Sequence, residues 1–188
     1  MSKYDIAITL FTIVYGLMLT DLFLSFHKLI RSRKLIKWHW LPLLAAWYLF
    51  MIILKNWWDL AFFQSDIDWM NIYFFIAYGH LLFLIFLLVS TALPDDIQNG
   101  RIDLKEYYFK NHRYFWGLMS AVVILSITIG IIKRISLSTA ESIKIYGIIG
   151  NSVFIIFTIL LAITKKYWIH SIFLILFVIG IILEILNK

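Results

Sequence analysis

The sequence predicts an all-α membrane protein, a single domain over residues 1–188 built as a polytopic bundle of six transmembrane helices. Hydrophobic residues make up 62% of the chain, whereas a soluble domain has about 45–50%. They also occur in long runs separated by short polar breaks. A helix needs about 20 such residues to cross the hydrocarbon core of a bilayer. We therefore expect a lipid bilayer around this chain.

Six apolar runs are long enough to span a membrane. They cover residues 6–27, 41–63, 69–93, 114–132, 145–164 and 167–186. Backbone groups need partners inside lipid, and the sequence lacks the alternating polarity of a barrel, so each run is predicted to be a helix. No small-x-small pattern follows the first run, which we expect to be retained. Only Lys165 and Lys166 separate the last two runs, which predicts a tight hairpin between antiparallel neighbours.

The longest break, residues 94–113, has a helix-start signal of its own. Asp103-Leu104-Lys105-Glu106 has the spacing of a capping box. Leu104, Tyr107, Tyr108, Asn111 and Phe115 then fall near one side of a helix. The pattern favours a short amphipathic helix near residues 103–113, lying on the inner leaflet or running into the fourth span. The alternative is a loop that solvates the membrane surface.

The basic residues predict the orientation. Eleven of the 17 Lys and Arg residues fall in the first, third and fifth breaks, five fall on the opposite side, and Lys55 lies inside a span. Basic residues are enriched in cytoplasmic loops, so we expect both termini outside the cytoplasm. The net charge of +6 is therefore interpreted as membrane orientation and not as nucleic-acid binding.

The first span carries a stripe of small and polar residues. Thr9, Thr12, Gly16 and Thr20 recur at spacings of three and four, with Asp21 at the edge of the stripe. One interpretation is a face toward a hydrated pathway, with Asp21 as a cation or proton ligand. The other is a helix-packing seam, with Asp21 hydrogen-bonded or reaching toward the interface.

The second span carries two opposite charges. Lys55 and Asp59 are four residues apart, beside Asn56, so they share one helical face and can neutralise each other. The alternative is that Lys55 pairs with an anionic substrate or a gating contact. Depth along the spans suggests that Asn71, Asn151 and Glu184 join the same polar cluster.

Cofactor and metal chemistry is not expected. The chain has no cysteine and no hydrolase, zinc-protease, phosphate-loop or dinucleotide motif. His80 lies in mid-span without a partner, whereas His27, His39, His112 and His170 lie near the cytoplasmic face and could gather there. An intramembrane enzyme acting on lipid stays open as a third hypothesis for function.

The first functional hypothesis is a small ion channel or transporter, as a homo-oligomer because six short helices leave little room for a pore. The alternative is a scaffold, accessory or effector subunit that docks a cytoplasmic protein on the basic loops. The candidate docking residues are Arg31, Arg33, Lys34, Lys37, Tyr107, Lys110 and Arg113.

Several stretches carry a family resemblance. They are Tyr15-Gly16 through Thr20-Asp21-Leu22, the Trp57-Trp58 pair, Leu93-Pro94-Asp95, and Tyr107-Tyr108-Phe109 through Arg113-Tyr114-Phe115-Trp116-Gly117. With these motifs the chain resembles a family of small bacterial six-span membrane proteins with no assigned activity. The resemblance covers most of the chain and implies a bacterial inner membrane and six spans, but no mechanism.

Overall fold

The computed structural model describes residues 3–62, 72–96, 101–136 and 145–186, and this part of the chain is almost entirely helical. The long helices are α1 (Lys3–Arg31), α2 (Trp40–Phe62), α3 (Ile72–Ser90), α4 (Leu104–Ser136), α5 (Ile145–Ile163) and α6 (Tyr167–Leu186). A 3-10 turn η1 (Arg33–Leu35) and two short strands, β1 (Ile36–Lys37) and β2 (Ile102–Asp103), complete the described elements. The predicted all-α bundle is confirmed.

Helix length and hydropathy agree with membrane crossing. Five helices, α1, α2, α3, α4 and α6, are long and apolar enough to span a bilayer. In α5 the described apolar stretch is Ser152–Ile163, so the sixth span stays a prediction. The predicted third-span start at residues 69–71 and second-span end at residue 63 lie outside the described residues.

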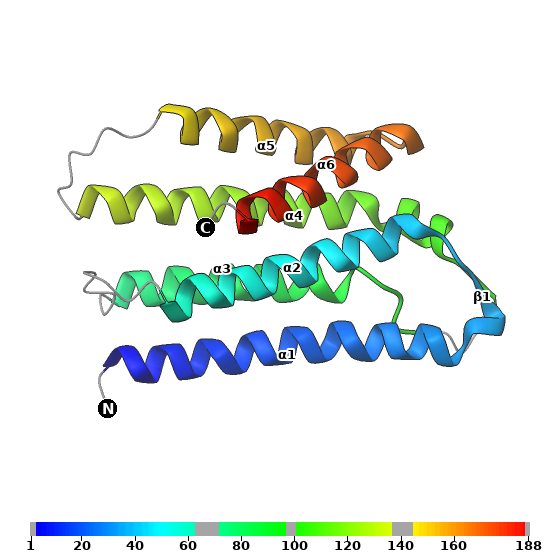
Figure 1. The fold of residues 1–188 in the computed structure, drawn as a ribbon, viewed down its shortest axis with the longest axis horizontal. Helices are drawn as coiled ribbons and strands as arrows, with labels where there is room; N and C mark the ends of the chain where they lie inside the picture. The colour runs from blue at the N-terminus through cyan, green and yellow to red at the C-terminus, as the bar shows by residue number, and fades with distance from the viewer. Residues whose placement is uncertain (1–2, 63–71, 97–100, 137–144, 187–188) are drawn as a thin grey trace.

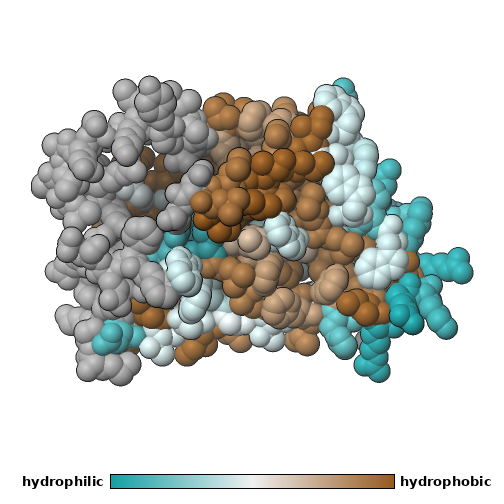
Figure 2. All heavy atoms as spheres, viewed as in Figure 1, coloured by the Kyte–Doolittle hydropathy of each residue, from teal (hydrophilic) through white to brown (hydrophobic). Residues whose placement is uncertain are grey.

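The surface of the bundle is apolar around its middle. Large apolar side chains point outward, for example Ile13, Leu17, Phe83 and Ile156, each more than half exposed. Figure 2 shows this apolar surface over the middle of the bundle and polar residues at the end where β1 lies. A soluble protein rarely exposes so large a continuous apolar patch, whereas lipid tails solvate it.

The helices run alternately up and down. α1 packs on α2 and α3, α3 packs on α4, and α4 packs on α5, while α2 also contacts α4 and α6 (Figure 1). Met18 of α1, Leu49 of α2, Ile85 of α3 and Trp116 of α4 are almost fully buried in the shared core. α1 begins and α6 ends toward the same end of the bundle.

A small strand pair joins the first and third breaks at the other end of the bundle. β1 and β2 are parallel, with Ile36 opposite Ile102 and Lys37 opposite Asp103. The Asp103 carboxylate accepts hydrogen bonds from the backbone amides of Lys105 and Glu106, at 2.8 and 3.2 Å, so Asp103 caps α4 as its spacing predicted. α4 then continues without interruption through the fourth span. The predicted amphipathic segment near 103–113 is therefore the start of α4 and not a separate helix on the membrane surface.

The break at Lys165 and Lys166 is confirmed, but the two helices that it joins separate quickly. α5 and α6 touch through Phe157–Phe173 and Phe154–Phe177, with ring centroids 4.4 and 4.5 Å apart. α6 then leans away from α5 and packs mainly on α2 (Figure 1). The expected antiparallel pair is therefore splayed, with α6 packed on α2.

Candidate functional site

The charged group at the centre of the site comes from two helices. The Lys55 ammonium donates to Asp59 at 2.8 Å, one helical turn further along α2, and to Glu184 of α6 at 3.0 Å. The predicted Lys55–Asp59 pair is thus confirmed, and Glu184 joins it as its depth suggested. A charged lysine inside a span costs a few kcal/mol or more without a partner. Its two carboxylate contacts explain why α6 packs against α2 at this point.

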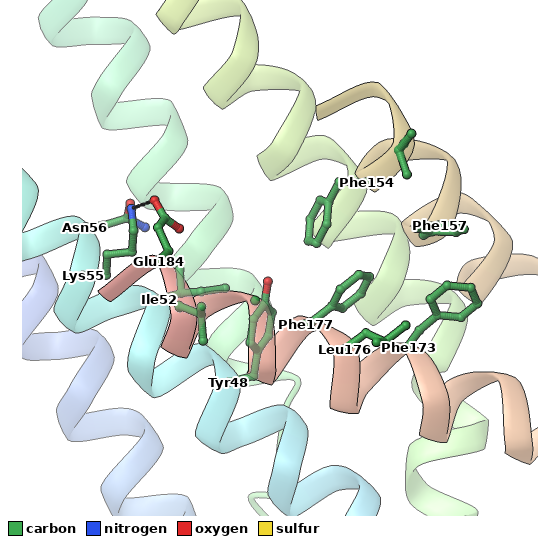
Figure 3. A pocket seen from close by; sticks show the side chains of 13 residues that line it. Tyr48, Ile52, Lys55, Asn56, Phe154, Phe157, Phe173, Leu176, Phe177 and Glu184 are labelled. Carbon is green, nitrogen blue, oxygen red and sulfur yellow. Dashed lines mark ion pairs between the residues drawn. The ribbon is translucent and has the colours of Figure 1, made fainter. Parts of the chain in front are cut away.

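This charged group lies at one end of a cavity of about 500 Å³ bounded by α2, α5 and α6. The opposite end is aromatic. The residues that shape the cavity are Tyr48, Lys55 and Asn56 of α2, Phe154 and Phe157 of α5, and Phe173, Phe177, Gly180 and Glu184 of α6. Figure 3 shows Lys55, Asn56 and Glu184 gathered at one side and Phe157 and Phe173 at the other. The splay of α5 and α6 creates this space.

The positive charge of Lys55 is compensated by neighbouring carboxylates. Lys55 brings one positive charge, and its two partners, Asp59 and Glu184, bring two negative charges. The Lys55 side chain is 18% exposed, whereas that of Glu184 is 55% exposed and lies at the rim. Lys55 and Glu184 line the cavity and Asp59 does not, so the two charges on the cavity wall balance. This arrangement argues against the interpretation of Lys55 as the receptor of an anionic substrate.

The polar stripe of α1 lies elsewhere. Thr12, Gly16 and Thr20 are exposed on the outer surface of the bundle, whereas Tyr15 and Met18 form the buried face of the same helix. The Thr20 hydroxyl donates to the Gly16 carbonyl of its own helix at 2.8 Å. Thr12 accepts from the indole of Trp57 at 3.3 Å. Because α2 stands between α1 and α6 (Figure 1), the structure does not bring the stripe into the cavity.

Asp21 sits beside a contact that the sequence did not predict. Ser25 of α1 donates to Asp95, just after α3, and the Lys28 ammonium lies 3.8 Å from the same carboxylate. The Asp21 Oδ2 atom is buried and makes no hydrogen bond within the described residues. Two stretches that carry the family resemblance, Thr20-Asp21-Leu22 and Leu93-Pro94-Asp95, thus meet at the same end of the bundle.

Two of the four interfacial histidines also meet. The His112 and His170 rings are 5.8 Å apart between centroids. His170 is held by Tyr108 at 2.9 Å and by the Thr164 carbonyl at 2.8 Å, and Trp116 donates to the same tyrosine at 2.9 Å. This buried chain of hydrogen bonds locks α6 to α4. His80, by contrast, is exposed and bonds the Ile76 carbonyl of its own helix.

No group of three or more potential metal ligands occurs among the described residues. His112 and His170 are close, but both ring nitrogens of His170 already have hydrogen-bond partners. The histidine contact therefore ties α4 to α6.

The candidate docking residues lie at the β1 end. Arg31, Arg33, Lys34, Lys37, Lys110 and Arg113 are exposed. Tyr107 is half-buried and donates to the Thr91 carbonyl at 3.2 Å, so it ties α4 to the end of α3. Lys37 pairs with Asp103 at 2.7 Å. That pair raises the pKa of the Lys37 ammonium and lowers the pKa of the Asp103 carboxyl, through their shared hydrogen bond.

Comparisons with known proteins add no relative: no protein-family model, curated protein or solved structure matches this chain. The class therefore rests on the fold and its surface. Long apolar helices with lipid-compatible outer faces define a multi-pass integral membrane protein. The family resemblance drawn from the sequence motifs stays a prediction.

Proposed function

We propose that the protein is a small transporter or channel of a bacterial inner membrane, and that its substrate site is the α2–α5–α6 cavity. The observation that supports this proposal is a cavity with charged groups at the depth of the membrane-spanning helices. Ionisable residues in such a position usually mark a substrate or ion path. The exposed Glu184 carboxylate at the rim of the cavity favours cations, including protons, as the species that is moved.

This proposal places the substrate site on α2 and α6, whereas the sequence pattern favoured the polar stripe of the first span. The outward-facing stripe of Thr12, Gly16 and Thr20 is then the contact face of a homo-oligomer. Exposed glycine and threonine residues on a membrane helix allow close packing of a second helix. A Cβ atom added at Gly16 would meet no neighbouring atom within 4 Å, so a partner helix has room to approach.

The test is flux in proteoliposomes, with protons, Na⁺, K⁺ and tetraethylammonium as transported species. A Gly180→Leu variant fills the cavity, because a Cβ at Gly180 would meet no neighbouring atom within 4 Å. The matched control is Gly117→Leu, at an equally open glycine on α4 that does not line the cavity. Flux lost in Gly180→Leu and kept in Gly117→Leu supports the proposal. Absence of flux for every cation in the well-folded parent protein overturns it.

Asp21→Asn separates the two candidate pathways. If α1 lines the path as the first-span hypothesis holds, Asp21→Asn changes the rate or selectivity of flux while Gly180→Leu leaves both unchanged. If the cavity is the path, Gly180→Leu changes the rate or selectivity of flux while Asp21→Asn leaves both unchanged.

A second function, docking of a cytoplasmic protein, is favoured by the β1 end. Trp38 and Trp168 are exposed, and so are Arg33 and Lys34. Exposed aromatic and arginine side chains are enriched at protein interfaces. The test compares the size of the complex extracted from native membranes with and without Arg33→Glu and Lys34→Glu. A defined partner lost in that variant supports an accessory subunit, and an unchanged complex rules out docking through these two residues.

A further inference from the structure

We propose that the α2–α5–α6 cavity is a lipid site for a zwitterionic phospholipid whose head carries a phosphate and a primary ammonium, the chemistry of phosphatidylethanolamine. The head lies at the Lys55–Glu184 end of the cavity, and one acyl chain lies among the phenylalanine rings. The inference goes beyond the proposed function, because it names what occupies the cavity when no transported ion does. It uses the same cavity but concerns binding, so it holds or fails separately from transport.

The charges on the cavity wall determine the net charge of the head. Lys55 and Glu184 both line the cavity, and their side chains meet at 3.0 Å. A ligand of either net charge would lie against one like charge, which costs free energy in a partly buried site. A head that carries both charges meets each wall charge with its opposite. The balanced pair therefore selects a zwitterion.

Hydrogen-bonding groups without partners lie beside the same pair. An ammonium has three N–H donors, and Lys55 directs two of them at Asp59 and Glu184. Among the described residues its third N–H has no partner, and the Asn56 side chain, which also lines the cavity (Figure 3), makes no hydrogen bond. Both groups can donate to phosphate oxygens. Glu184, whose side chain is 55% exposed, can accept from a primary ammonium.

The cavity has the polarity of one bilayer leaflet. α6 has 20 residues, so its length is about 30 Å, the thickness of the hydrocarbon core. Glu184 lies in the last turn of α6, near one boundary of that core. Phe173 precedes it by about three helical turns, or about 16 Å, which is close to half of the core. A phospholipid of that leaflet has its head and its chain in the same order.

The end away from the charges is shaped for an acyl chain. Phe154 packs on Phe177 and Phe157 packs on Phe173, with ring centroids 4.5 and 4.4 Å apart. These four rings line the cavity (Figure 3) and offer apolar area without a hydrogen-bonding group. The volume of about 500 Å³ is within the range of ligand sites, roughly 300–1,000 Å³. It takes one chain, while the second chain of the lipid stays in the bilayer.

The cavity opens toward lipid on the outside of the bundle. Val153 of α5 and Leu176 of α6 both line the cavity, and they are 41% and 52% exposed. Apolar side chains in this position are solvated by lipid tails. A phospholipid can therefore enter sideways from its own leaflet, with its head kept at the membrane boundary.

The experiment is native mass spectrometry of the delipidated protein in detergent, titrated with phosphatidylethanolamine, phosphatidylcholine and phosphatidylglycerol that carry identical chains. The ammonium of phosphatidylcholine is methylated and cannot donate, and phosphatidylglycerol has the phosphate without an ammonium. We expect one phosphatidylethanolamine per protomer to bind saturably and about tenfold more tightly than either of the other two, since hydrogen bonds between charged groups are strong. Equal affinity for phosphatidylethanolamine and either competitor, or no saturable binding, overturns the inference.

Two substitutions separate the two halves of the head. Glu184→Gln removes the partner of the ammonium and should weaken phosphatidylethanolamine binding about tenfold without weakening that of phosphatidylglycerol. Asn56→Leu removes a donor to the phosphate, which both lipids carry, and should weaken both about fivefold. The matched controls, Glu106→Gln and Asn111→Leu, lie on α4 outside the cavity. Because the Asn56 side chain has no hydrogen bond to lose among the described residues, its variant preserves the test if Glu184→Gln does not fold. Equal effects of each variant and its control overturn the inference.

Binding and flux are measured separately. Gly180→Leu, which fills the cavity, should abolish lipid binding, whereas Gly117→Leu should keep it. Selective binding of phosphatidylethanolamine by a protein that moves no cation would refute transport and leave the lipid site standing. Cation flux in vesicles of phosphatidylglycerol alone, by a protein without lipid selectivity, would refute the lipid site and support transport.

Discussion

Two regions that look alike in the sequence behave differently in the structure: the polar stripe of α1 and the charged group of α2. Both place polar residues inside an apolar span. The threonines of α1 face outward, and Thr9 and Thr20 bond carbonyls of their own helix. Lys55 bonds Asp59 on its own helix and reaches across to Glu184 of α6. A hydroxyl can be satisfied within one helix, whereas a charged group in lipid needs an opposite charge.

The largest effect is expected at Lys55. Lys55→Met leaves two carboxylates without their shared cation and should lower the free energy of unfolding by about 3–5 kcal/mol, as when a buried ion pair is broken. Thr20→Val, on the outer surface, should change it by less than about 0.5 kcal/mol. Reversible unfolding in mixed SDS micelles, followed by tryptophan fluorescence, measures both. Similar losses of unfolding free energy in Lys55→Met and Thr20→Val would show that the charged group contributes no more to stability than the outer stripe.

A smaller loss is expected when an inward-facing hydrogen bond is removed without a charge. His170→Phe takes away the partner of Tyr108 and the bond to Thr164. A buried group left unsatisfied costs about 1–3 kcal/mol, so the variant should fall between Lys55→Met and Thr20→Val in the same assay. A loss as large as that of Lys55→Met would show that burial, and not charge, sets the ranking.

The outward stripe should affect assembly more than folding. Gly16→Leu adds bulk where nothing neighbours the glycine, so the protomer should keep its stability while self-association weakens. We expect about a tenfold loss in dimer affinity, corresponding to about 1.4 kcal/mol, measured by single-molecule photobleaching in vesicles. Gly117→Leu is the control on α4. An unchanged oligomer in Gly16→Leu would refute the stripe as a contact face.

The smallest effect is expected outside the membrane, at Lys37 and Asp103. The lowered pKa of Asp103 means that its stabilisation is present at neutral pH and is lost as pH falls through that lowered pKa. The raised pKa of Lys37 means that its stabilisation is also present at neutral pH and is lost as pH rises through that raised pKa.

Asp103→Asn keeps a capping side chain and removes the charge. We expect its melting temperature to be slightly below that of the parent protein at pH 7 and to approach it as pH falls through the lowered pKa of Asp103. A difference that persists once Asp103 is protonated would assign the effect to the cap instead of the ion pair.

The amino-acid pattern was enough to predict the all-α class, the positions of the apolar helices, the Asp103 cap and the Lys55–Asp59 pair. These features depend on composition, on hydrophobic run length and on contacts within four residues along one helix. Orientation, oligomeric state and family stay predictions.

Which faces of the helices meet became known from the packing of the folded chain. In the structure the α1 stripe faces outward and α6 packs on α2 more than on α5. Asp95 contacts Ser25, and His112 contacts His170. In this chain nearly every face is apolar, and lipid solvates an outward apolar face as well as a core does. The hydrophobic pattern therefore does not predict which face of each helix is buried. Because the cavity beside Lys55 depends on those faces, it could not be predicted from the sequence.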